Sequence, residues 1–463
     1  MSVANQPIMK LIVITLPNFF PGEAEAITTL FRYGLEILHL RKPEANLTEI
    51  VKLLDQIPEE YHSRIVIHEH FQLVNQYNLK GIHLNRRNPN PPQDYKGNIS
   101  CSCHTLNEVQ LRKPTCNYVF LSPIYDSISK TGYSSAFTIC EIQKAQQQGI
   151  IDSHVMALGG INASRLNEVK QLGFGGAALL GDVWNHLGAD FVPHFLRLRQ
   201  ETFTPVILSI AGSDCSGGAG IQADTKTISA LGGYAATVIT AVTAQNTQGV
   251  QAIYPQSEEI VRRQIESVMD DLTPHAIKIG MVHDVDIVTA IADCLKTYRP
   301  KHIVYDPVMI STSGRRLMTE KTVQEICEKL FPLCDLITPN LHETALLTSK
   351  TINSINDMEQ AAQTLAHHYG ISVLVKGGHL EGDKMFDVLF HQENTYHYVA
   401  PKIESHNLHG TGCTLSSAIA TQLAYGISME QAVKQAKQYT YQAINRGKNM
   451  QIGHGNGPLW HFF

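Results

Sequence analysis

The stretch VILSIAGSDCSGGAGIQAD, residues 206–224, decides the fold class of the second half of the chain. Its first five residues, Val206 to Ile210, are typical of a buried strand. A glycine-rich loop and the start of a helix follow. Glycines permit backbone shapes and close approaches that a Cβ atom blocks. The succession of strand, open loop and helix predicts an α/β fold that binds ligands at its strand ends.

Further apolar runs continue this rhythm towards the C-terminus. Candidate strands begin near His275, His302, Leu336 and Val373, and amphipathic segments separate them. Because strands that alternate with helices pair in parallel, we expect a mostly parallel sheet covered by helices on both faces.

The first 200 residues contain eight short apolar runs. They are LIVIT (11–15), EILHL (36–40), IVIH (65–68), GIHLN (81–85), ISCSCH (99–104), YVFLS (118–122), VMALGG (155–160) and GAALLG (176–181). Eight strand-then-helix units of this size predict a (β/α)8 TIM barrel near its minimum length, with one or two degenerate helices. We therefore predict a barrel over residues 1–200, a linker over 201–205 and a second α/β domain over 206–463.

Composition limits the classes of partner. A net charge of −5 argues against a nucleic-acid partner, and no apolar run approaches the ~18 residues of a membrane span. The first residues lack the pattern of a signal peptide, and nine cysteines without paired spacing argue against a disulfide framework. We expect a cytoplasmic, homo-oligomeric protein whose partners are small molecules.

Two pairs of possible metal ligands lie near strand ends of the first half. Cys101 and Cys103 lack a second Cys/His pair at ligand spacing, and we expect their thiols on opposite faces of a strand. His68 and His70 are likewise expected to point apart. We predict no metal at either pair.

Two motifs of the second half carry carboxylates. Asp224 begins a helix beside several glycines, so we assign it a ligand role, with helix capping as the alternative. Asn340 and Glu343, in TPNLHE (338–343), are three residues apart and share one face of a helical turn. They could position Mg²⁺ through its retained waters, and a capping box is the alternative.

Two further motifs suit phosphate. Lys376, in KGGH (376–379), can reach a phosphate from a strand end. In NLHGTGCTLSSAIA (407–420), Gly410 and Gly412 free backbone N–H groups at a helix start, which forms an anion site. Phosphoryl transfer needs these parts. The helix dipole favours the Cys413 thiolate, which could accept a hydroxyl proton; in the alternative, Cys413 is only a small buried residue.

These motifs resemble those of the ribokinase-like superfamily, which usually has Gly-Ala-Gly-Asp where residues 410–413 read Gly-Thr-Gly-Cys. Together with AGSDxSGGAGIQAD, TAQNT and KGGH, they are similar to hydroxymethylpyrimidine/phosphomethylpyrimidine kinases of thiamine synthesis over residues 205–460. The resemblance implies a three-layer α/β/α domain that uses ATP and Mg²⁺. It also implies two successive phosphorylations of 4-amino-5-hydroxymethyl-2-methylpyrimidine.

The same resemblance implies residue roles. It places Gly212, Asp224, Gln245 and Met281 at the pyrimidine, Asn340, Gly410, Thr411 and Gly412 at ATP, Glu343 and Asp306 at the metal, and Lys376 and Cys413 in catalysis. A pyridoxal kinase of the same superfamily is the alternative.

The first half resembles thiamine-phosphate synthases and the related thiazole tautomerases over residues 9–187. The synthase joins the pyrimidine diphosphate to thiazole phosphate and releases pyrophosphate. Matching positions for these phosphates and for the metal are Arg41, Glu69, Ser102, Lys130 and Gly160.

The barrel departs from the synthase pattern at three strand ends. His39-Leu-Arg-Lys-Pro43 replaces Gln-x-Arg-acidic-Lys, His68-Glu69 replaces Asn-Asp, and Asn85–Asn88 replaces an acidic metal site. We expect synthase activity. The alternative is a non-catalytic module that binds and senses a thiazole or pyrimidine phosphate, or a divergent tautomerase.

Overall fold

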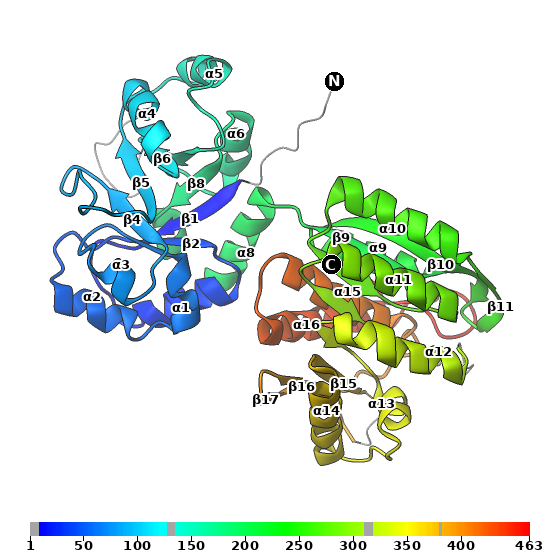
Figure 1. Ribbon diagram of the computed structural model, residues 1–463. Coiled ribbons are helices and arrows are strands. Elements are labelled where there is room, and N and C mark those ends of the chain that lie inside the picture. Colours follow the sequence, from blue (N-terminus) through cyan, green and yellow to red (C-terminus); the bar gives the residue numbers. More distant parts are fainter. Residues whose placement is uncertain (1–8, 127–134, 310–317, 379–381) are drawn as a thin grey trace. The chain divides into compact units, whose positions relative to one another are not determined.

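The computed structural model describes residues 9–126, 135–309, 318–378 and 382–463 and divides the chain into two compact units (Figure 1). Unit 1 is Met1–Phe203 and unit 2 is Thr204–Phe463. The division falls inside the segment expected as a linker, residues 201–205, whose first two residues still belong to a helix. Within the described residues, no helix is long and apolar enough to cross a membrane.

The eight strands of unit 1 pair in parallel and close into a barrel in the order β1 to β8. They are β1 (Lys10–Ile14), β2 (Ile37–Leu40), β3 (Ile65–Ile67), β4 (Gly81–Leu84), β5 (Asn98–Cys103), β6 (Tyr118–Leu121), β7 (Val155–Leu158) and β8 (Gly176–Leu179). Each of the eight apolar runs forms one strand, so the predicted barrel is confirmed.

Helices cover the outside of the barrel. They are α1 (Glu23–Arg32), α2 (Leu47–Leu54), α3 (Leu73–Gln76), α4 (Leu106–Arg112), α5 (Ile139–Gln147), α6 (Leu166–Gln171), α7 (Gly181–Trp184) and α8 (Phe191–Thr202). The connection from β4 to β5 contains no helix, in line with the short spacing of those two runs.

The barrel interior is apolar on most strands and polar near β2 to β5. Ile12, Ile37, Val66 and Phe120 belong to its apolar cluster. His39 lies in register with Ile14 on β1, which belongs to the same interior cluster. Residues two apart on a strand share a face, so His39 points inward with Ile37.

The same rule corrects one expectation. Cys101 and Cys103 lie on one face of β5, not on opposite faces, and their Sγ atoms are 3.9 Å apart. Both thiols join the apolar cluster between the strands and the outer helices.

Unit 2 contains a nine-stranded sheet in the order β11-β10-β9-β12-β13-β14-β15-β16-β17. The strands are β9 (Val206–Asp214), β10 (Tyr234–Asn246), β11 (Gly249–Pro255), β12 (Ala276–Ile279), β13 (Ile303–Tyr305), β14 (Leu336–Ile337), β15 (Ser372–Gly377), β16 (Lys384–His391) and β17 (Asn394–Pro401). Pairing is parallel from β10 to β15 and antiparallel at both edges. The mostly parallel sheet was expected, whereas β10, β11, β16 and β17 were not identified from the sequence.

Helices lie on both faces of this sheet, as expected. They are α9 (Gly220–Ala230), α10 (Glu258–Leu272), α11 (Val285–Tyr298), α12 (Glu320–Glu325), α13 (Leu341–Thr348), α14 (Ile355–Tyr369), α15 (Thr411–Ala424) and α16 (Met429–Gly447). Leu208, Ile210, Ile277 and Ile279 pack with α10, α11 and α14 in one core. Alternate residues of the same strands, Ser209 and Lys278, bond to Asp224 of α9 on the other face. The arrangement has three layers, α/β/α.

Candidate functional site

A cavity of about 720 Å³ lies at the carboxyl ends of the strands of unit 2. Its walls include the ends of β9, β10, β13 and β15 and the starts of α13 and α15, and residues of β16, β17 and α16 complete the lining. Eleven of the twelve kinase residues predicted from the sequence line it: Gly212, Gln245, Met281, Asp306, Asn340, Glu343, Lys376, Gly410, Thr411, Gly412 and Cys413.

Asp224 is the exception and corrects the prediction. Its carboxylate is fully buried, lies 2.8 Å from Lys278 Nζ, and accepts hydrogen bonds from Ser209 and Ser417. The side chain of Asp224 points from α9 towards the sheet and α15, not into the cavity. An apolar interior requires a buried charge to be paired, and Lys278 of β12 is the partner of this carboxylate. The structure does not support a ligand contact by Asp224.

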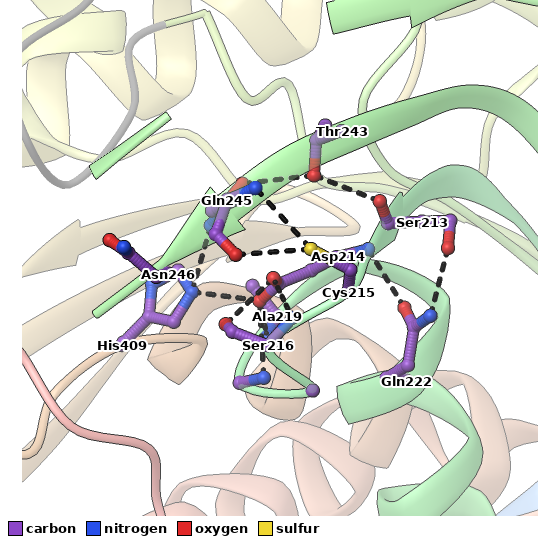
Figure 2. Close-up of polar contacts among 12 residues, drawn as sticks. Ser213, Asp214, Cys215, Ser216, Ala219, Gln222, Thr243, Gln245, Asn246 and His409 are labelled. Carbon is purple, nitrogen blue, oxygen red and sulfur yellow. Dashed lines mark hydrogen bonds and ion pairs between the residues drawn. The ribbon is translucent and has the colours of Figure 1, made fainter. Parts of the chain in front are cut away.

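A second aspartate of the same motif lines the cavity. Asp214, at the end of β9, accepts hydrogen bonds from the backbone N–H groups of Ser216, Gly218 and Ala219 (Figure 2). Burial alone would raise its pKa, but these bonds and His409 hold it at about 2. The carboxylate is therefore ionised. Asp214 belongs to the sequence motif quoted at the outset, and its position close to three glycines could have identified it as a cavity residue.

His409 joins this aspartate to the predicted pyrimidine contact. Its Nε2 lies 2.9 Å from Asp214 Oδ2 and 3.0 Å from Gln245 Nε2 (Figure 2). His409 directly precedes Gly410, the N-cap of α15. The loop after β9, the end of β10 and the start of α15 thus meet at one imidazole, which sequence reasoning missed.

The side of the cavity that was predicted to bind phosphate contains a buried ion pair. Lys376 Nζ lies 2.6 Å from Asp306 Oδ1, which also accepts a hydrogen bond of 3.0 Å from Thr338. A Cβ atom at Gly412 would lie 2.9 Å from Asp306 Oδ2 and 3.3 Å from Lys376 Nζ. The start of α15 therefore approaches this pair so closely that only glycine fits without displacement.

Asn340 and Glu343 form the capping box that was the alternative to a metal site. Asn340 Oδ1 accepts from the backbone N–H of Glu343 at 2.9 Å, and Glu343 Oε2 accepts from that of Asn340 at 2.7 Å. Both residues still line the cavity. Burial raises the pKa of Glu343 to about 7, with Lys376 opposing the rise.

Cys413 lies in the cavity wall but not in the ionisation state expected from the sequence. Burial raises the pKa of its thiol to about 11, although Lys278 opposes that rise. The dipole at the start of α15 therefore does not suffice to hold a thiolate. At neutral pH Cys413 is a thiol, which corrects the expectation of a favoured thiolate.

The predicted metal ligand of the barrel is engaged by protein groups. Glu69 Oε1 lies 2.6 Å from Arg87, and its Oε2 accepts from the backbone N–H of Lys42. The Lys42 ammonium is itself buried against Glu23 at 2.7 Å. Arg41 lies at the same strand end, where Glu69 and Arg87 both influence its pKa, which burial lowers.

The remaining barrel predictions have different outcomes. Ser102 bonds to His83 Nε2 at 2.8 Å. Gly160 adopts φ +65°, and its carbonyl accepts from Arg165 at 2.7 Å. Lys130 lies outside the described residues.

Three histidines meet inside the barrel near these strand ends. His39 Nδ1 lies 2.9 Å from His68 Nε2, and His83 stacks on His68 with ring centroids 4.2 Å apart. Burial lowers the pKa of all three, that of His83 to about 3, so the imidazoles are neutral. His70 follows the strand with φ 55° and bonds elsewhere, to the carbonyl of Ala45. The separation of His68 from His70 thus agrees with expectation, but the close contact of His68 with His39 was missed.

Comparison with known proteins gives a match for each unit. Residues 214–460 match the family model described as phosphomethylpyrimidine kinase, and residues 11–183 match that described as thiamine monophosphate synthase. Bacillus subtilis pyridoxal kinase, solved as an ADP complex, is 33% identical with a TM-score of 0.51, and the match covers 56% of this chain and 98% of that one.

Two curated relatives extend the match. The hydroxymethylpyrimidine/phosphomethylpyrimidine kinase of Rhizobium meliloti is 48% identical over 260 residues, which are 56% of this chain and 97% of the relative. The thiamine biosynthesis bifunctional protein ThiED of Geobacter sulfurreducens is 34% identical over 406 residues, covering 86% of this chain and 82% of the relative. The chain therefore belongs to the family of bifunctional thiamine biosynthesis proteins, in which a thiamine-phosphate synthase domain is joined to a phosphomethylpyrimidine kinase domain.

Proposed function

We propose that the cavity of unit 2 transfers the γ-phosphoryl group of ATP to the hydroxymethyl oxygen of 4-amino-5-hydroxymethyl-2-methylpyrimidine, and then a second one to the monophosphate. The observation that carries this proposal is the continuity of the cavity. It joins a polar end, at Asp214, Gln245 and His409, to a phosphate-binding end, at Asp306, Lys376 and Gly412. An acceptor and a donor can therefore lie against each other in one cavity.

At the acceptor end, the residues offer polar and apolar contacts to a ring. Gln245 presents an amide that can pair with the edge of an aminopyrimidine. Met281 brings its thioether close to Gly212, where a Cβ atom would lie 2.9 Å from its methyl carbon. The polarizable thioether of Met281 and the side-chain-free backbone of Gly212 can both contact a planar ring.

At the donor end, charge and backbone donors face the phosphates. Gly410, Thr411 and Gly412 start α15, so their N–H groups and the helix dipole favour an anion. Lys376 exchanges part of its contact with Asp306 for a phosphate oxygen and stabilises charge that develops during transfer. Asn340, at the start of α13, pairs with Lys376 in an isolated β-bridge, and we assign it the ATP contact beside that lysine.

The residues also fit Mg²⁺. Asp306 and Glu343 supply hard carboxylate oxygens, the ligands that this ion prefers, and both line the cavity. When bound, Mg²⁺ neutralises charge on the transferring phosphates. Glu343 would help to hold the ion while it keeps its capping contacts with Asn340.

Cys413 receives the hydroxyl proton in this proposal. Its thiol first loses its own proton to solvent water, and the positive charge of Lys278 favours this loss. The step costs free energy at neutral pH, since the pKa lies near 11.

Assays with purified full-length protein test the kinase assignment. We expect ADP formation from ATP and Mg²⁺ with hydroxymethylpyrimidine, and again with its monophosphate. The likeness to a pyridoxal kinase makes pyridoxal the second candidate acceptor. Turnover with pyridoxal and none with either pyrimidine overturns the proposal.

We further propose that the barrel condenses the pyrimidine diphosphate with thiazole phosphate, so that it consumes the kinase product. Arg41 and Gly160 lie at strand ends that suit phosphate binding. A phosphate-binding module is the second candidate, because Glu69 is paired with Arg87 and Ser102 with His83. Formation of thiamine phosphate from the two purified substrates with Mg²⁺ supports the synthase. Saturable binding of either substrate without product supports the module.

Location and assembly stay proposals. All nine cysteines are free thiols, which suits the reducing cytoplasm. We propose that the protein acts there as a homo-oligomer, and sedimentation of the purified chain measures its mass.

A further inference from the structure

Three histidines from neighbouring strands point into the barrel and converge. His39 lies on β2, His68 directly follows β3, and His83 lies on β4. One ring nitrogen of each lies within 4.8 Å of the others, and all three side chains are buried. None of them has a role in the functions described above.

The spacing of these nitrogens suits a bound ion. Zn–N bonds of about 2.0–2.1 Å put the nitrogens of a tetrahedral site about 3.4 Å apart. The pair His39 Nδ1 and His68 Nε2 is closer, at 2.9 Å, and the widest separation is below 4.8 Å. The rings of His68 and His83 are stacked at an interplanar angle of 24°, so one of them has to turn before all three nitrogens reach bonding distance of one ion.

Partners hold the far nitrogens of two rings. The hydroxyl of Tyr118 lies 2.7 Å from His39 Nε2, so His39 Nδ1 is the nitrogen left for the centre. Ser100 Oγ lies 2.9 Å from His83 Nδ1, and Ser102 Oγ lies 2.8 Å from His83 Nε2. One serine can therefore keep its hydrogen bond and orient the ring, while the other releases its nitrogen to the ion. Metal-bound histidines are oriented by such partners.

The chemistry of the cluster selects the class of ion. All three ligands are imidazoles, and the nearby carboxylate of Glu69 is paired with Arg87. Imidazole suits Zn²⁺, Co²⁺ and Ni²⁺, whereas Mg²⁺ requires oxygen ligands. We propose that His39, His68 and His83 form a site for a divalent d-block ion of the Zn²⁺ class, with one coordination position open to an oxygen ligand.

A second group of similar residues provides a matched control. Asp182, His186 and His194 also have ligand atoms within 4.8 Å of one another. There, however, His194 Nε2 already lies 2.8 Å from the Asp182 carboxylate, and His186 stays partly exposed. Substitution of His186 tests whether metal found in the protein belongs to this second group.

The experiment uses the full-length chain from cells supplied with Zn²⁺, because the site is buried and an ion can enter during folding. We expect about one equivalent of zinc per chain after dialysis. After replacement by Co²⁺, we expect visible d–d bands of a nitrogen-ligated, four-coordinate ion. If the wild-type chain contains no zinc and shows none of these bands, the proposal is overturned. The three histidines then form only a hydrogen-bonded part of the core.

Substitutions of single residues show which histidines bind the ion. His39→Gln and His68→Asn keep neutral hydrogen-bonding side chains and are expected to lose the equivalent of metal, whereas His186→Gln retains it. Tyr118→Phe, which leaves all three ligands, is expected to weaken binding about ten- to hundred-fold. Metal lost only in His186→Gln, or Co²⁺ bands unchanged in His39→Gln, contradicts the site. The test does not use turnover, so its failure is separate from failure of the synthase proposal.

Discussion

Two opposing effects act on the thiol of Cys413. Its place at the start of α15 and the nearby Lys278 favour the thiolate, whereas removal from water disfavours it. Burial has the larger effect, since the pKa rises to about 11. A base of this kind gains its active form as pH rises, in contrast to an aspartate, which is ionised throughout the neutral range.

This balance predicts the pH dependence of kcat. For the wild-type chain, we expect kcat to rise with pH between about 7 and 10, because the thiolate fraction rises towards the pKa near 11. Cys413→Ala is expected to lower kcat about 10²- to 10⁴-fold and to remove this rise. Cys413→Asp is expected to give a flat profile, because its carboxylate stays ionised.

Steady-state ADP release with hydroxymethylpyrimidine measures all three profiles. A Cys413→Ala variant that keeps the wild-type rate rules out the base role and leaves the backbone donors as the catalytic groups.

Glu343 predicts a pH-dependent stability. Its pKa rises from 4.5 to about 7 on folding, so the folded chain binds the proton more strongly than the unfolded chain. The contribution of Glu343 to stability is therefore full below pH 4.5 and declines as pH rises through 7. Glu343→Gln removes this decline, and a glutamine at the third helical position can still cap the N–H of Asn340.

Melting temperatures between pH 5 and 8 test this prediction for both chains. We expect the wild type to lose more stability than Glu343→Gln over that range. Parallel curves for the two chains contradict it.

At the scale of elements, the start of α15 and the ends of β13 and β15 form the proposed phosphate site. The helix start meets the ion pair of Asp306 and Lys376 with no space for a side chain at Gly412. Close approach of a backbone to charged groups is the condition under which a helix start can bind a phosphate tightly.

Substitution at Gly412 tests this contact. We expect Gly412→Ala to reduce kcat/KM for ATP more than tenfold, because the new methyl group displaces Asp306 Oδ2 or Lys376 Nζ. Gly378→Ala is the matched control: Gly378 lines the same cavity, but a Cβ atom there meets nothing within 4 Å. Equal ATP kinetics for both variants would falsify the packing argument.

At the scale of the whole molecule, each unit has its own core. One cluster of buried apolar residues belongs to the barrel and another to the three-layer unit. Within the described residues, the first cluster runs from Met9 to Leu198 and the second from Leu208 to Phe390.

Separate cores predict an autonomous kinase. A chain of residues 204–463 is expected to fold and to phosphorylate hydroxymethylpyrimidine with kcat within about twofold of the full-length value. Circular dichroism and the ADP-release assay measure both properties. An unfolded or inactive fragment shows that the barrel contributes to the kinase fold or site.

The sequence predicted the folds well because periodicity is a local property. Each barrel strand appeared as an apolar run, and each phosphate motif appeared as glycines beside a polar residue. The strands β10, β11, β16 and β17 were missed because each is partly exposed, and the apolar residues of β10 and β16 are interrupted by polar ones. The capping box of Asn340 and Glu343 was foreseen only as the alternative, since one spacing serves both capping and metal binding.

The sequence by itself thus determined both fold classes, the family and eleven of the residues that line the kinase cavity, because those features follow from short-range patterns. Only the tertiary structure decided which aspartate of one motif reaches the cavity. Asp214 ends a strand at the cavity, whereas Asp224 lies on the helix face that packs on the sheet and pairs with Lys278. Only the structure also brought His39, His68 and His83 together, because barrel closure places side chains from separate strands at one point. Burial and three-dimensional contact set these outcomes, and neither is encoded in the spacing of residues along the chain.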